Sequence, residues 1–401
     1  MFVPVKTIGR FLTILTLLMG ELVSAQQPAP PEPIRKGPYL IYPGDPSTMT
    51  ILWQLDSARP SRLEWGPVSA PLTQSATVSQ YQNNFQYQHT LSGLTPGQAY
   101  DYRLQGEGFQ TSGTFTAAPP ATAQSVKFLI YGDSRTHVEE HDRQCGAMLQ
   151  LMRTDPQYRS LVLHLGDLVE NGSDENKWQE QLFTHSWKNL RILLASVPFH
   201  AVRGNHENDG VLFRKYWPYP YDQNPKCYGS FDYGPVHLTI VDQYEEGPTH
   251  TKDTSLLSAA QLEWIGQDLA ATRKPWKLLL LHWPGWSAGP HGNQQGVQKQ
   301  LQPLCDRYGV AAVIGGHNHN YARAVVDGVE HITAGGGGAP SSKPQMDNKS
   351  RPYVLTASPR HHFCKVAVDA QGFHFEAVEP DGKVLDSFTL SAPPQPHPSH
   401  L

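Results

Sequence analysis

Residues 126–135 read VKFLIYGDSR and set a pattern that recurs along the chain. The first six residues are mostly apolar and run directly into the polar cluster Gly132-Asp133-Ser134-Arg135, and an apolar run this short is typical of a buried strand. Four later segments repeat this pattern of an apolar run followed by a polar cluster: 161–165 before Gly166-Asp167, 202–203 before Gly204-Asn205-His206-Glu207, 278–281 before His282, and 310–314 before Gly316-His317-Asn318-His319. The sequence therefore predicts several strands that each end in chemically active side chains.

Helical stretches separate these strands, and one of them begins at Ser258, with Gln261 as its expected capping-box partner. Alternating strands and helices predict an α/β domain (α+β by some schemes) over residues 125–390, with a β-sheet core flanked by helices. In an open α/β sheet the carboxyl ends of the strands open onto one crevice. We therefore expect one set of side chains to lie together there: Asp133, Asp167, Asn205, His206, His282, His317 and His319.

The expected set contains carboxylate and amide oxygens and imidazole nitrogens, but no thiolate. Such donors suit Zn, Mn or Fe, and the set is large enough for two metal ions with one bridging carboxylate. Each residue alone is a weak signal, because an Asp after a strand is usually a turn residue and a lone His is usually a surface residue. Five clusters on five strand ends are much harder to assign to chance, and they favour a metal site.

The segment before this domain has a different pattern. Met49, Ile51 and Trp53 alternate along one predicted strand, and the turn at 94–97 leads into a second strand that contains Tyr100. A buried Trp on an early strand and a Tyr after a late turn are typical of a β-sandwich. The Leu-x-Pro-x-x-x-Tyr pattern resembles a fibronectin type III domain, which we place at residues 38–118.

The N-terminal residues 1–25 have the layout of a secretory signal peptide: a basic start, a short apolar run and small residues before a cleavage point. A membrane anchor is the alternative, but the apolar run is shorter than the roughly 20 residues that cross a bilayer. We expect a secreted or periplasmic protein with no stable membrane insertion after cleavage. A Pro-rich linker is expected at 26–37 and a Pro-rich tail at 391–401.

Composition narrows the remaining possibilities. The chain has 401 residues, a net charge of -4 and 39% hydrophobic residues, so it is neither disordered nor basic enough for wholesale binding of nucleic acid. Export would place the protein in an oxidising compartment. The four cysteines, Cys145, Cys227, Cys305 and Cys364, then form one or two disulfides or remain as buried thiols.

The order of the polar motifs resembles that of the calcineurin-like metallophosphoesterases, and Gly316 to Arg323 together with the preceding sandwich resembles the purple acid phosphatase branch. The resemblance implies two metal ions (Fe, Mn or Zn) and hydrolysis of a small phosphoester by a metal-bound hydroxide. It implies one metal held by Asp133, Asp167 and His319. It implies a second metal held by Asp167, Asn205, His282 and His317. Asp167 would bridge the two metals. His206 would be the general acid that protonates the leaving oxygen.

Two positions depart from the family pattern. The purple branch has a colour-giving Tyr three residues after the bridging Asp, where this chain has Glu170. We therefore predict a colourless enzyme, in which Glu170 orients His206, acts as a ligand itself or is a solvated loop residue. Many relatives have a His ligand where this chain has Arg135, which cannot ligate a metal. Arg135 is expected at the rim as a phosphate contact or in a structural salt bridge.

The loop after His282 is similar to a segment of bacterial relatives, and the resemblance implies that His291 contacts the substrate phosphate. Trp283 and Trp286 either form an apolar wall for the leaving group or serve in packing. The sequence thus predicts an exported phosphomonoesterase. A phosphodiesterase or pyrophosphatase with the same site is one alternative, and a non-catalytic binding protein that works through its sandwich is another.

Overall fold

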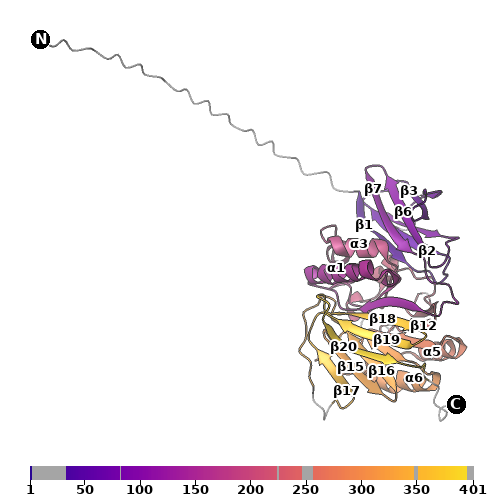
Figure 1. Ribbon diagram of the computed structural model, residues 1–401, viewed down its shortest axis with the longest axis vertical. Coiled ribbons are helices and arrows are strands. Elements are labelled where there is room, and N and C mark those ends of the chain that lie inside the picture. The colour runs from indigo at the N-terminus through magenta and orange to yellow at the C-terminus, as the bar shows by residue number, and fades with distance from the viewer. Residues whose placement is uncertain (2–32, 82, 224, 246–255, 347–350, 395–401) are drawn as a thin grey trace. The chain divides into compact units, whose positions relative to one another are not determined.

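The computed structural model describes residue 1 and residues 33–81, 83–223, 225–245, 256–346 and 351–394 (Figure 1). Most of the predicted signal peptide (2–25), residues 26–32 of the predicted linker and residues 395–401 of the predicted tail lie outside this description. Among the described residues, no helix combines the length and the apolar character that a membrane crossing requires.

The N-terminal domain is a β-sandwich of a three-stranded sheet, in the order β1-β2-β5, and a four-stranded sheet, in the order β4-β3-β6-β7. Its strands are β1 (Ile34–Ile41), β2 (Met49–Leu55), β3 (Ser61–Pro67), β4 (Gln74–Val78), β5 (Gln86–Leu91), β6 (Ala99–Gly106) and β7 (Phe109–Thr116). Trp53 is fully buried and stacks on Tyr87, with ring centroids 5.5 Å apart. The Tyr100 hydroxyl accepts a hydrogen bond of 2.8 Å from the Thr95 amide, which fixes the turn before β6.

The sandwich begins earlier than the sequence suggested. β1 starts at Ile34, whereas the linker was expected to run to residue 37. Ile34 is buried in the core of the sandwich and Lys36 donates a hydrogen bond to Gln54, so the end of the Pro-rich stretch is already paired as a strand.

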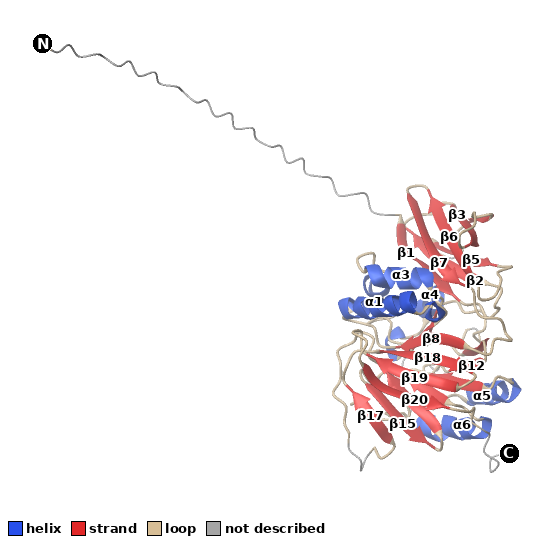
Figure 2. Cartoon of the chain, viewed as in Figure 1, coloured by secondary structure: helices blue, strands red, loops and turns tan. Residues whose placement is uncertain are grey.

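The second domain contains two mixed sheets rather than one open sheet (Figure 2). The first has the order β10-β9-β8-β18-β19-β20, with β8, β9 and β10 parallel. Its strands are β8 (Val126–Tyr131), β9 (Val162–His164), β10 (Phe199–Ala201), β18 (Phe363–Asp369), β19 (Gly372–Val378) and β20 (Val384–Leu390). The strand–helix alternation expected from the sequence does not continue to the end of the domain, because β18, β19 and β20 follow one another without a helix and pair antiparallel.

The second sheet has the order β11-β12-β13-β14-β16-β15-β17, with β12, β13, β14 and β16 parallel. Its strands are β11 (Gly229–Tyr233), β12 (Val236–Ile240), β13 (Trp276–Leu280), β14 (Ala312–Gly315), β15 (Tyr321–Val326), β16 (Val329–Ala334) and β17 (Val354–Ser358). Alternate residues of β8 and β13 face the space between the two sheets, where Phe128 and Ile130 join Leu278 and Leu280 in one buried cluster.

Helices cover the outer faces of both sheets. They are α1 (Val138–Thr154), α2 (Glu175–Lys177), α3 (Lys188–Ser196), α4 (Val211–Tyr216), α5 (Ala259–Ala271) and α6 (Gln302–Tyr308). Met148 of α1 and Leu193 of α3 share a buried cluster with Leu129 of β8, while Ile265 of α5 and Leu279 of β13 share another. The fold class predicted from the sequence is confirmed, with two sheets forming the core.

Two local expectations have different outcomes. Ser258 caps α5 by accepting a hydrogen bond of 3.1 Å from the Gln261 amide, as expected. The Gln261 side chain does not complete a capping box, because it bonds both main-chain groups of Asp242 instead.

All four cysteines are buried free thiols, which leaves the disulfide alternative without support.

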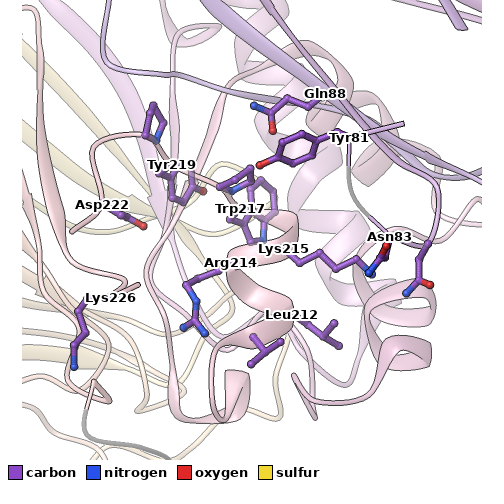
Figure 3. A pocket seen from close by; sticks show the side chains of 14 residues that line it. Tyr81, Asn83, Gln88, Leu212, Arg214, Lys215, Trp217, Tyr219, Asp222 and Lys226 are labelled. Atoms are coloured by element: carbon purple, nitrogen blue, oxygen red, sulfur yellow. The ribbon is translucent and has the colours of Figure 1, made fainter. Parts of the chain in front are cut away.

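A pocket of about 940 Å³ lies between the sandwich and the region of α4 (Figure 3). Tyr81 and Gln88 line it from the sandwich, and Arg214, Trp217 and Tyr219 line it from the second domain. The residues around this pocket include none of those predicted for the metal site, so the two features are separate.

Candidate metal centre

The strand ends of both sheets bring the predicted donors together. Asp133 follows β8 and Asp167 lies three residues after β9, in the first sheet. His282 lies two residues after β13 and His317 two residues after β14, in the second sheet. Asn205 opens a short 3-10 turn, Asn205–Glu207, beyond β10. The site therefore lies where the carboxyl ends of strands from two facing sheets meet, and not at the edge of a single sheet.

The backbone at this place is unusual. Asp133, Asp167 and His317 have φ values of 60°, 57° and 63°, in the left-handed region that residues other than Gly rarely adopt. Such conformations persist only where the surroundings impose them, and they concentrate at functional sites. Each of the three residues turns sharply out of its strand, which directs its side chain across the strand ends.

Two of the glycines in the motifs are required by close approach. A Cβ atom on Gly204 would lie 2.3 Å from Oδ1 of Asp167, and one on Gly316 would lie 2.3 Å from Oδ2 of Asp133. The glycine of one motif thus makes room for the carboxylate of another. This explains on physical grounds why the polar clusters begin with glycine.

A first half-site is formed by Asp133, Asp167 and His319, whose ligand atoms all lie within 4.8 Å of one another. Both carboxylates are buried, and Nε2 of His319 is 3.7 Å from Oδ1 of Asp133. His319 donates through Nδ1 to the main-chain carbonyl of Pro340 at 2.9 Å. Its Nε2 therefore carries a lone pair that faces the carboxylates.

A second half-site is formed by Asp167, Asn205, His282 and His317. Oδ1 of Asn205 lies 3.0 Å from Nε2 of His282 and 2.9 Å from Nδ1 of His317, and these two nitrogens are 3.2 Å apart. Oδ1 of Asp167 lies 3.3 Å from the same His282 nitrogen. Two donor atoms that each lie about 2.1 Å from one metal are separated by roughly 3.0 to 3.4 Å, so these spacings fit a shared cation.

The orientation of His282 agrees with this fit. Its Nδ1 donates to the main-chain carbonyl of Leu165 at 2.7 Å, which directs Nε2 at the Asn205 oxygen and at Asp167. An imidazole nitrogen, an amide oxygen and a carboxylate that converge in a buried space form a donor set that a metal ion can bind. Burial, with the charge of Asp167 nearby, raises the pKa of Asp133 to about 8, as expected for two carboxylates that share a buried space.

Two residues that hold the ligands were given no role by the sequence. The buried carboxylate of Glu207 accepts hydrogen bonds from the amides of Asp167, Leu168 and Gly204, at 3.0, 2.8 and 2.7 Å. It thereby ties the β9 turn to the β10 turn. Glu207 lies within the motif quoted above, so its position was a signal, but its contacts are not visible in the sequence.

Gln243 is the second of these residues. Its Oε1 accepts hydrogen bonds from the amides of His282, at 3.0 Å, and Trp283, at 2.7 Å, and its Nε2 donates to the Trp283 carbonyl. Gln243 follows β12 and His282 follows the neighbouring strand β13, so Gln243 fixes the main chain at His282 across the two strand ends. No motif surrounds Gln243 in the sequence, and nothing there could have identified it.

His206 lies beside both half-sites, but its partner differs from the expected one. Its Nδ1 donates to the main-chain carbonyl of Glu170 at 2.6 Å, and its Nε2 lies 3.8 Å from Oδ2 of Asp167. The Glu170 carboxylate lies 3.3 Å from Nζ of Lys177, and its side chain is 46% exposed. The carboxylate expected to orient His206 thus contacts Lys177 in this structure, and it is not part of the ligand group of the first half-site.

Arg135 lies inside the site rather than at its rim. Its Nε is 3.3 Å from Oδ2 of Asp167 and its Nη2 is 3.4 Å from Nε2 of His319. His291 is exposed, with its ring centroid 4.7 Å from that of His317. Both residues predicted to contact phosphate are thus next to the predicted ligands.

The two tryptophans have separate roles. Trp283 is buried and packs against the His317 ring, with centroids 4.2 Å apart. Trp286 packs against His331, with centroids 4.4 Å apart, and joins the cluster under α5 and α6. Neither matches the expected wall for a leaving group, because Trp283 supports a predicted ligand and Trp286 packs in the core.

Comparisons with known proteins agree with this geometry. Residues 126–321 match the calcineurin-like phosphoesterase family, and residues 36–118 match the N-terminal domain of purple acid phosphatases. The chain is 24% identical over 416 residues to acid phosphatase type 7 of Mus musculus, covering 88% of this chain and 90% of that protein. It is 26% identical over 220 residues to the human tartrate-resistant acid phosphatase type 5, covering 48% of this chain and 66% of that protein.

Among solved structures, a purple acid phosphatase from yellow lupin seeds superimposes with a TM-score of 0.72 at 20% identity, covering 89% of this chain and 74% of that chain. At this identity the likeness concerns the fold, and it extends over both domains. Taken with the family matches and the acid phosphatase relatives, it shows that the chain is a metallophosphoesterase, a phosphoric ester hydrolase that joins a calcineurin-like phosphoesterase domain to the N-terminal domain of purple acid phosphatases.

Proposed function

We propose that the protein is an exported phosphatase that uses two metal ions to hydrolyse phosphomonoesters. The observation that carries the proposal is the pair of half-sites that share Asp167: Asp133 and His319 on one side, and Asn205, His282 and His317 on the other. The donors suit Fe, Mn or Zn. When bound, the metals would supply Lewis acidity and an activated water for attack on phosphorus.

The chain's own residues contribute the remaining chemistry. His206 holds its Nδ1 proton on the Glu170 carbonyl, so its Nε2 is the nitrogen that can hold and transfer a proton at the leaving oxygen. The guanidinium of Arg135 is placed to take phosphate oxygens, and His291 stands on the side of the second half-site. Glu207 and Gln243 keep the ligands in place through their main-chain amides.

Export is proposed from the sequence of residues 1–25 alone. Cleavage there would release the two folded domains to the periplasm or the medium, where a small phosphoester is the expected substrate.

The test is a paired hydrolysis assay on the mature protein. Metals are stripped, Mn, Zn or Fe is added back separately, and a nitrophenyl monoester is compared with the bis-nitrophenyl diester. We expect metal-dependent turnover that favours the monoester and that Asp167→Asn or Asn205→Ala abolishes. A preference for the diester would retain the site but change the substrate class. Intact turnover in either variant, or no turnover with two metals bound per chain, would contradict the proposal.

A further inference from the structure

The two half-sites differ in the cations that the protein itself provides. At the first half-site, Nε of Arg135 is directed at Oδ2 of Asp167 and Nη2 at Nε2 of His319, at 3.3 and 3.4 Å. The Arg135 side chain is only 17% exposed, and Asp167 is buried, so this contact is shielded from water. A guanidinium remains charged at all relevant pH values. A permanent cation thus faces the same lone pairs that a first metal ion would use.

The second half-site has no such neighbour. Among the described residues, no Lys or Arg side chain lies within hydrogen-bonding or ion-pair distance of Asn205, His282 or His317. The side chains of these three residues make hydrogen bonds with one another and with the main chain, and His282 also lies 3.3 Å from Asp167.

We propose that Arg135 makes the two half-sites unequal, so that the second half-site binds its metal tightly and the first binds its metal weakly and exchangeably. A metal entering the first half-site must break the contacts of the guanidinium with Asp167 and His319, and it must also bind next to a fixed positive charge. The cost of breaking charge-assisted contacts of this kind lowers the affinity of the first half-site for its metal roughly ten- to hundredfold.

This inference rests on the proposed two-metal site and adds a regulatory property to it. At low metal concentration the chain holds one metal ion, and the second is gained only when the guanidinium leaves. The released guanidinium then becomes available for a phosphate oxygen pair, so loading of the first half-site and the contact with substrate phosphate are linked through one side chain.

The test is a titration of the metal-free, full-length mature protein with Mn²⁺, followed by calorimetry and by electron paramagnetic resonance. We expect one tight equivalent with an uncoupled signal, and then a weaker equivalent that produces a spin-coupled pair. Arg135→Gln should tighten the weaker equivalent at least about tenfold. Arg135→Lys, which keeps the charge on a side chain without the planar fork, should tighten it less.

Three further variants assign the equivalents. Lys177→Gln is the matched control, because it removes a cation that contacts Glu170 and not the donors, and it should leave both affinities unchanged. Asp133→Asn should weaken only the weaker equivalent, and Asn205→Ala should weaken mainly the tight one. Equal affinities in the wild type, or an Arg135→Gln variant that is folded by thermal melting but binds the weaker equivalent no better, would overturn the proposal.

Metal binding is measured here without any substrate, which separates this inference from the proposed function. A chain that hydrolyses no ester but shows the predicted shift with Arg135→Gln would refute the phosphatase proposal and leave the unequal half-sites standing. An active phosphatase that binds two metal equivalents with equal affinity would support the phosphatase proposal and refute the unequal half-sites.

Discussion

The Nδ1 atom of His206 lies 2.6 Å from the main-chain carbonyl oxygen of Glu170, while the carboxylate of Glu170 turns to Lys177. The position of residue 170 therefore matters to His206, but its side chain does not. A main-chain carbonyl is present whichever residue occupies the position, so a different side chain there leaves the orientation of His206 intact.

The first prediction separates the role of the Glu170 main-chain carbonyl from that of its carboxylate. Glu170→Gln should leave kcat/KM within about twofold of wild type, because exposed ion pairs such as that with Lys177 contribute little. His206→Gln should reduce kcat about 10²- to 10⁴-fold, the usual contribution of a general acid. Steady-state kinetics on a nitrophenyl monoester measure both. A loss in Glu170→Gln comparable to that in His206→Gln would show that the carboxylate does act on His206.

The second prediction concerns Glu207, whose carboxylate accepts from three main-chain amides. Glu207→Gln would turn an amide N–H₂ group toward at least one of these donors. We expect the free energy of unfolding of the metal-free protein to fall by about 1 to 3 kcal/mol. Metal affinity should fall about 10- to 100-fold.

Denaturant unfolding in the presence of a chelator measures the first effect of Glu207→Gln, and a metal titration measures the second. The matched control is Glu139→Gln, which changes an exposed carboxylate at the start of α1. Unchanged metal affinity in Glu207→Gln would mean that the turns hold their shape without this carboxylate.

The third prediction is a pH dependence that originates away from the metal centre. Burial lowers the pKa of His237, but hydrogen bonds to Asp232, at 2.7 Å, and Asp268, at 3.0 Å, outweigh burial and raise the pKa to about 9. The unfolded value is about 6.5, so the stabilisation is fully present below that pH and is lost as pH rises toward 9. The effect is on the order of 3 kcal/mol.

His237→Gln should therefore remove part of the fall in unfolding free energy between pH 6.5 and about 9, which urea unfolding at a series of pH values measures. His374→Gln serves as the control, because His374 pairs with Asp369 at the surface. If the wild-type and His237→Gln curves run parallel across this window, the buried His237 is not charged in the folded protein.

The fourth prediction is spectroscopic. The side chain at position 170, where the purple branch has its Tyr, is an exposed carboxylate. The buried Tyr244 has its ring 6.1 Å from that of His282, and burial raises the pKa of its phenol well above the ordinary value, which opposes ligation. Iron-loaded protein should therefore lack a tyrosinate-to-iron band in the visible range. A band that appears and then disappears in Tyr244→Phe would contradict this.

The sequence alone indicates which residues to expect in the donor set. Parallel strands end at one edge, so Asp133, Asp167 and His317 could be placed together from their positions after apolar runs. The strand–helix alternation and the alternating pattern around Trp53 likewise indicated the two domain types before any contact was known.

The interactions among these residues could not be read from the sequence, because contacts between distant segments depend on the packing of two sheets. The tertiary structure placed the motifs on facing sheets, it gave Glu207 and Gln243 their hydrogen bonds to the ligand-bearing turns, and it turned the Glu170 carboxylate outward. It also placed Arg135 against Asp167 and His319. Periodicity records which face of a strand is buried, whereas the direction of a long polar side chain is fixed only by the partners that the fold brings within reach.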